Sequence, residues 1–84
     1  MKKRSDWEIY LEILDTLKKM KLREEEIYKT NIMHEVNMNW KSFDKHFKYL
    51  EQKKFVQKNN KDYKITQEGK KLHNTLNKLN NLLT

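Results

Sequence analysis

A short polar turn between two apolar repeats constrains the fold of this chain more than any other feature. The turn is Asn37-Met38-Asn39, and asparagine tolerates the left-handed backbone angles that a sharp reversal requires. Apolar residues fall at helical spacing on both sides of it, at Ile32, Met33 and Val36 before the turn and at Phe43, Phe47 and Leu50 after it. Two short helices joined so tightly predict the geometry of a helix-turn-helix.

Polar residues predict where these two helices begin. Thr30 is expected to cap the first helix, and Asn39 is a favourable N-cap for the second, which we expect over residues 39–53. Burial of the apolar stripe on this second helix turns its opposite face outward, because successive residues are rotated by about 100°.

The N-terminal segment predicts a further helix on the same core. Ser5 and Glu8 match a capping box, and apolar residues recur at helical spacing up to about residue 20, at Trp7, Ile9, Tyr10, Ile13, Leu14 and Leu17. Residues 21–29 lack this periodicity, so we expect a helix end and a loop there, with Ile27-Tyr28 as a candidate short strand.

The C-terminal third predicts a hairpin and a last helix. Two β-prone runs, 55–57 and 63–65, flank the turn-rich stretch 58–62, and Thr66 then caps a helix over 66–84. Its leucines form a heptad-like seam at Leu72, Leu76, Leu79, Leu82 and Leu83. The expected fold is mainly α with a small β-hairpin (α+β), in the order helix, helix, helix, strand, strand, helix. Residues 1–84 form a single domain, because a chain of this length has room for one core.

The composition favours a polyanion as the partner. Nineteen Lys and Arg against twelve Asp and Glu give a formal net charge of +7. Nucleic acid is the first candidate, although abundant lysine is also a mark of AT-rich genomes. A membrane surface comes second, but no apolar run approaches the roughly 18 residues of a spanning helix, and we expect a soluble, cytoplasmic protein. The absence of cysteine excludes disulfides and thiolate metal sites.

The outward face of helix 39–53 carries three lysines in one row. Such a helix fits the major groove of DNA, where lysine meets phosphates or guanine edges. An ordinary solvated helix face is the alternative interpretation, and Trp40 is expected either to pack on the preceding helix or to wedge beside the DNA backbone. The candidate DNA-binding residues of this helix are Asn39, Trp40, Lys41, Ser42, Asp44, Lys45, Lys48 and Tyr49.

The hairpin tip is a second basic element, suited to follow the DNA backbone or to enter the minor groove. Residues 1–4, Met-Lys-Lys-Arg, are expected to add a flexible basic arm. The candidate DNA-binding residues of the hairpin are Lys58, Asn59, Asn60, Lys61 and Lys64.

No pattern in the sequence predicts catalysis, a metal site or a cofactor. His34-Glu35 lacks the second histidine of a zinc-binding helix, and His46 and His73 are isolated, so we interpret all three histidines as structural or surface residues. Gly69 is the only glycine, which excludes a glycine-rich phosphate loop. The carboxylates of residues 24–26 stand in a polar stretch without a nucleophile.

The chain resembles the archaeal winged helix-turn-helix transcriptional regulators, including the small dimeric chromatin-associated DNA-binding proteins of archaea. The resemblance rests on residues 8–14, 29–56 and 63–72, with a Lys-Thr-x-Ile-Met run, an Asn-apolar-Asn turn and Thr-x-x-Gly-Lys after the hairpin. It implies that helix 39–53 is the recognition helix, that residues 58–62 are the wing tip, and that the last helix is the dimer contact through an antiparallel coiled coil.

Two departures from the family pattern modify these expectations. Lys54 stands where the family often has a glycine, so the turn out of the recognition helix is expected to differ. The last helix is short, so any dimer should be compact.

These observations predict a homodimer that binds double-stranded DNA, as a transcriptional regulator or a nucleoid-associated protein. The leucine seam has a second interpretation, packing on the chain's own first helix. The leading alternative function is a protein-protein interaction module without DNA binding, and RNA binding is weaker because the major groove of A-form RNA is closed to a helix.

Overall fold

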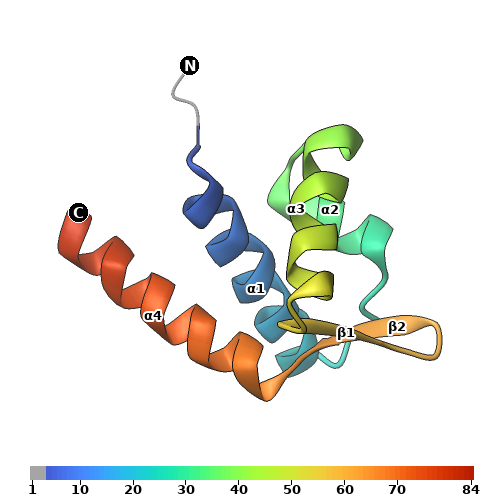
Figure 1. Ribbon diagram of the computed structural model, residues 1–84. Coiled ribbons are helices and arrows are strands. Elements are labelled where there is room, and N and C mark those ends of the chain that lie inside the picture. The colour runs from blue at the N-terminus through green and yellow to red at the C-terminus, as the bar shows by residue number, and fades with distance from the viewer. Residues whose placement is uncertain (1–3) are drawn as a thin grey trace.

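The computed structural model describes residues 4–84, which form four helices and one antiparallel hairpin. The predicted order is confirmed, and the bounds are α1 (Asp6–Leu22), α2 (Lys29–Val36), α3 (Trp40–Gln52), β1 (Val56–Asn59), β2 (Asp62–Ile65) and α4 (Gln67–Leu83). Helix α1 lies between α4 on one side and α2 and α3 on the other (Figure 1). The C-terminal end of α4 is therefore on the far side of α1 from the hairpin.

Helix α1 is the element on which the others pack. It begins after Ser5, whose backbone N–H and hydroxyl both donate to Oε1 of Glu8, at 3.1 and 2.7 Å. Its apolar stripe is buried along the whole length of the helix, at Ile9, Ile13, Leu14, Leu17 and Met20.

The turn between α2 and α3 forms as its asparagines predict. Asn37 takes left-handed angles, φ 53° and ψ 55°, and the Asn39 side chain caps α3 by accepting a hydrogen bond of 2.9 Å from the Ser42 backbone N–H. Thr30, however, is not the cap of α2. The helix starts earlier because Tyr28 is already extended and its carbonyl accepts from the Ile32 N–H at 3.0 Å.

The predicted strand at Ile27-Tyr28 is not formed. This segment is tied to the hairpin by one backbone hydrogen bond, in which the Tyr63 N–H donates to the Ile27 carbonyl at 2.9 Å. Ile27 is buried, so the segment is held by its side chain as well as by that bond.

The hairpin is longer than its sequence suggests. Val56 pairs with Ile65 and Asn59 pairs with Asp62, so the turn consists of Asn60 and Lys61 alone. The predicted loop at 58–62 is thus a correction, because residues 58, 59 and 62 belong to the strands. Asn60 takes a positive φ of 60°, which lets so short a turn close.

The turn out of α3 does not differ from the one that glycine favours. Lys54 has φ 64° and its N–H donates to the Glu51 carbonyl at 3.1 Å, while the Phe55 N–H donates to the Leu50 carbonyl at 2.9 Å. These two bonds form a Schellman motif. The Thr66 hydroxyl also donates to the Lys54 carbonyl, at 2.6 Å. The expected departure at this position is wrong, since lysine adopts the left-handed turn under these restraints.

Gly69 lies where α4 crosses the end of α3, and it is needed for space. A Cβ atom at this position would lie 2.1 Å from the Phe55 carbonyl oxygen and 2.7 Å from Cγ1 of Ile65. The same carbonyl accepts a hydrogen bond of 3.0 Å from the Thr66 N–H, so it cannot move without breaking that bond.

Gly69→Ala should therefore lower the free energy of unfolding by roughly 1–3 kcal/mol, the usual cost of overpacking. Urea denaturation followed by far-UV circular dichroism measures the change. Gln67→Ala, at an exposed position in the same turn, is the control and should stay within about 0.5 kcal/mol of the wild type. Equal stabilities of the two variants would contradict the packing argument.

Candidate nucleic-acid interface

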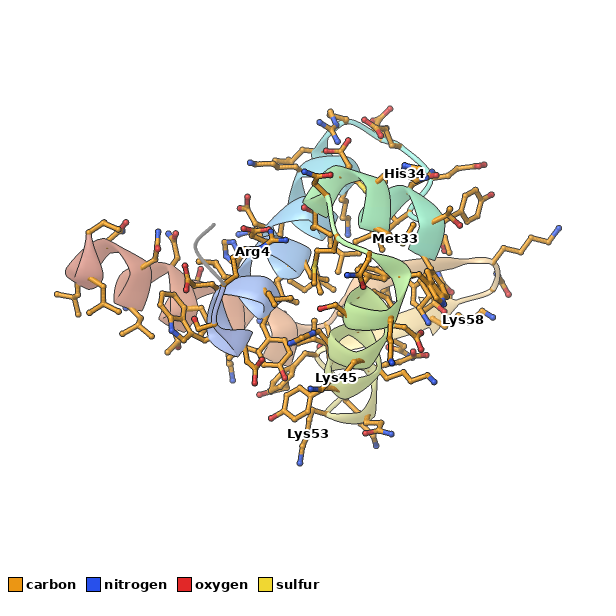
Figure 2. The ribbon with its side chains drawn as sticks, turned by 90° about the horizontal axis from the view of Figure 1, so that it is seen from above. Arg4, Met33, His34, Lys45, Lys53 and Lys58 are labelled. Carbon is orange, nitrogen blue, oxygen red and sulfur yellow. The ribbon has the colours of Figure 1, made fainter. Side chains whose placement is uncertain are left out.

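Helix α3 is fixed by its inner face, and its outer face is basic. Phe43, Phe47 and Leu50 are all 0% exposed, as the apolar spacing predicts. The opposite side of the helix is turned outward, and its residues Lys41, Lys45, Lys48 and Gln52 are all exposed. Figure 2 shows Lys45 and Lys53 on this helix and Lys58 on the hairpin. The predicted outward row of lysines is present in the fold.

The first turn of α3 has both capping and open groups. The Asn39 side chain is exposed although it accepts the cap bond, and Ser42 is half-buried beside it. Trp40 is 51% exposed, with its ring 6.1 Å from that of Phe43 and the Lys29 ammonium 5.2 Å from its centroid. One part of the indole thus packs on its own domain and the rest is open to a partner, so both expectations for Trp40 hold in part.

Asp44 is held by two lysines. Its carboxylate lies 2.6 Å from Nζ of Lys29 on α2 and 3.2 Å from Nζ of Lys48 on α3. The Lys29 ammonium also sits 5.3 Å from the Phe47 ring. Asp44 therefore ties α2 to the recognition face, and Lys48 shares its charge with this acid.

Tyr49 is 40% exposed at the edge of the core, stacked on Tyr10 of α1 with ring centroids 5.0 Å apart. Lys53 follows at the end of α3 with its Nζ 5.9 Å from the Tyr49 ring. Lys53 is an exposed cation that the sequence interpretation missed. Its position eight residues after Lys45 was the available signal, since that spacing returns to the same side of a helix.

The hairpin residues divide between two faces. All five candidates, Lys58, Asn59, Asn60, Lys61 and Lys64, are exposed. Lys58 is paired with Tyr63, whose ring meets the Phe47 ring edge-on at 4.9 Å, so these two residues belong to the face that packs toward α3. Lys64 is paired with Gln57 on the opposite face. The structure thus brings Lys58 and the tip toward the recognition helix and separates Lys64 from it.

Arg4 is the only residue of the predicted arm that falls within the described range, since residues 1–3 lie outside it. It is half-buried, and its guanidinium donates to the Glu12 carboxylate and, at 3.3 Å, to the Val36 carbonyl. Arg4 is consequently bound to α1 and to the end of α2, in place of the free arm that its sequence suggests.

The leucines of α4 have different surroundings. Leu72 and Leu76 pack on the chain's own core, with Leu76 only 8% exposed, so they correct the expectation that the whole seam faces a partner. Leu79 is half-buried, whereas Leu82 and Leu83 are 83% and 66% exposed. Both interpretations of the seam therefore apply, each to a different half of the helix.

The histidines take structural or surface positions. His34 is exposed on α2, while His46 and His73 are buried and lie beside Asp6 and Asp15 respectively. Within residues 4–84 no three potential metal ligands come together. The helices of that range are also too short or too polar to cross a membrane.

The acidic limb of the stability profile should depend on Asp44. Hydrogen bonds from Lys29 and then Lys48 hold the pKa of this carboxyl below its ordinary value, near 3.9. A pKa lowered by folding stabilises the protein above the unfolded value, and this contribution is lost as the pH falls through the folded one.

Asp44→Asn should therefore reduce the loss of stability between about pH 5 and pH 2, and Lys29→Gln should do the same because it removes the first donor. Thermal denaturation of the three proteins across this range tests the coupling. Parallel profiles for wild type and both variants would show that the pair has no energetic role.

Comparison with known proteins agrees with this arrangement. A sequence profile described as winged helix-turn-helix matches residues 3–84. The chain is also 38% identical over 77 residues to an uncharacterized protein of Methanocaldococcus jannaschii, an archaeon, and the alignment covers 92% of this chain and 74% of the relative. With the helix order, the asparagine turn, the hairpin and a match over nearly the whole length, the chain belongs to the winged helix-turn-helix family.

Proposed function

We propose that this protein binds double-stranded DNA with α3 in the major groove and the hairpin on the backbone or in the minor groove, as a transcriptional regulator or a nucleoid-associated protein. The winged helix-turn-helix domain is typical of DNA-binding proteins. The observation that carries the proposal is the basic outer face of α3, which the protein's own chain leaves uncovered. Its action is occupancy of the duplex, without chemistry on it.

The dimensions of α3 suit the major groove. Thirteen residues give a helix about 20 Å long, and the groove, about 12 Å wide, admits one helix with its side chains. Lys41 and Lys45 are in the first half of α3, the part that reaches base edges and adjacent phosphates in helix-turn-helix proteins. Within residues 4–84 neither of them takes part in a salt bridge, so their charges are available to phosphates.

The hairpin would extend the contact along the backbone. Lys58 and Lys61 are exposed near its tip, and the net charge of +7 favours any approach to a polyanion. Phosphate contacts make affinity depend steeply on salt, with a slope of log affinity against log salt of roughly −0.9 per contact. A DNA-bound protein of this kind would belong to the cytoplasm and the nucleoid.

A homodimer is the form in which we expect the protein to bind. The exposed leucines at the end of α4, together with half-buried Leu79, are the surface that favours it. Two recognition helices about 34 Å apart would reach successive major grooves on one side of the duplex. The same leucines favour the alternative function, a protein-interaction module, if their partner is another protein.

Replacing Lys41, Lys45 and Lys48 together by Ala should weaken binding to a mixed-sequence duplex by at least tenfold, and the salt slope should become shallower by up to about three contacts. The control is Lys70→Ala with Lys71→Ala and Lys78→Ala, which removes the same charge from exposed positions of α4. Titration of labelled duplex at two salt concentrations compares them. If the α3 variant stays within a factor of about two of the wild type, DNA binding through this face is excluded and the interaction module becomes the better interpretation.

Leu82→Glu with Leu83→Glu should convert the proposed dimer into a monomer, because two charges cannot be buried in an apolar contact. Both side chains are exposed in the single chain, so the helical circular-dichroism signal should be retained. Analytical ultracentrifugation gives the mass of each protein. A wild type that is already monomeric at high concentration would end the dimer proposal.

A further inference from the structure

The buried histidine of α3 makes two contacts that a neutral imidazole cannot satisfy together. His46 is 5% exposed and lies on the inner side of the helix. Its Nδ1 is 2.7 Å from the backbone carbonyl oxygen of Ser42, one turn earlier in α3. Its Nε2 is 2.9 Å from Oδ1 of Asp6, in the first turn of α1. The ring therefore connects the recognition helix to the helix on which the whole domain packs.

Both partners of this ring are acceptors. A carbonyl oxygen carries no proton, and an ionised carboxylate only accepts hydrogen bonds. The Asp6 side chain is 74% exposed, and exposed carboxyl groups are ionised at neutral pH. Each ring nitrogen must then donate, and only the imidazolium form has two N–H groups. The two distances together call for a charged His46.

The groups around His46 come from α1 and α3. Asp6 is the acid in contact with it, and Tyr10 meets the ring edge-on with centroids 5.4 Å apart. An open cleft of about 690 Å³ lies between the start of α1, the turn and the first half of α3, with His46 on its wall. The charged residues that share this wall with it are Arg4, Asp6, Lys41 and Lys45.

We propose that His46 is a positioning residue for DNA binding, whose imidazolium fixes the first half of α3 against α1 and makes duplex affinity depend on pH. The second part of this inference rests on the proposed function. When the ring loses one proton, one nitrogen lone pair faces an acceptor oxygen, and the hydrogen bond becomes a repulsion. The connection is thus complete at the acidic end of the physiological range and weakens as the pH rises. Lys41 and Lys45, carried by the same turns of α3, lose their fixed placement with it.

The protonation state is tested first, without DNA. In ¹⁵N NMR of the free protein labelled at histidine, both ring nitrogens of His46 should carry protons at about pH 6, and one of them should lose its proton by about pH 8.5. A single protonated nitrogen throughout this range would overturn the inference. This measurement stands even if the protein does not bind duplex, so failure of the proposed function and failure of the protonation argument are distinguishable.

The consequence for binding is tested with a mixed-sequence duplex at constant ionic strength. Wild-type affinity should fall by about two- to ten-fold between about pH 6 and pH 8.5, the range expected for the loss of one hydrogen bond. His46→Gln should bind with little pH dependence, because its amide does not titrate. Asp6→Asn should also flatten the profile, because an amide can donate to the neutral ring. Asp6 is exposed, so this second variant keeps the test valid if His46→Gln does not fold.

Two other histidines supply matched controls. His34→Gln removes the same kind of group from the exposed side of α2, and His73→Gln removes the other buried histidine, which lies 3.2 Å from Asp15 between α4 and α1. Both should keep the wild-type pH profile of affinity. A profile that persists at full size in His46→Gln, or that disappears in His34→Gln, would assign the effect elsewhere and overturn the proposal.

Discussion

Burial of one face of α3 against α1 is the interaction on which the rest of this domain depends. Phe43, Phe47 and Leu50 are withdrawn completely from water, which fixes the rotation of the helix about its own axis. Each such side chain contributes roughly 1.5–3 kcal/mol of transfer free energy, a large amount for a domain of this size. The basic face is a direct result, because a helix with one side held inside has the other side facing solvent.

Local patterns in the sequence were sufficient for most of the fold. The asparagines of the turn, the capping threonine of α4 and the apolar spacing of α3 each depend on neighbours within four residues, and each prediction is confirmed. The failures involve distant partners. Where α2 begins is set by Tyr28, and the length of the hairpin is set by cross-strand pairing, neither of which a local pattern reports.

The candidate site shows the same division. The outward row of lysines could be predicted because it is the complement of the buried stripe. The pairing of Asp44 with Lys29, and of His46 with Asp6, joins residues 15 and 40 positions apart, and only the packing of three helices brings them together. The burial of Leu76 was hidden for a different reason, since a heptad of leucines has the same spacing whether it faces its own domain or another chain.

The turns of this chain are built without glycine. Among residues 4–84, positive φ angles occur at Glu24, Asn37, Lys54 and Asn60, whereas the single glycine lies in a helix where no side chain would fit. A residue with a Cβ reaches this region at a cost of roughly 1–2 kcal/mol, less for asparagine, so the surrounding hydrogen bonds must hold it there. Such corners are stiff. The angle between α2 and α3 and the direction of the hairpin are consequently set in the free protein, and little conformational entropy remains to be lost when a ligand arrives.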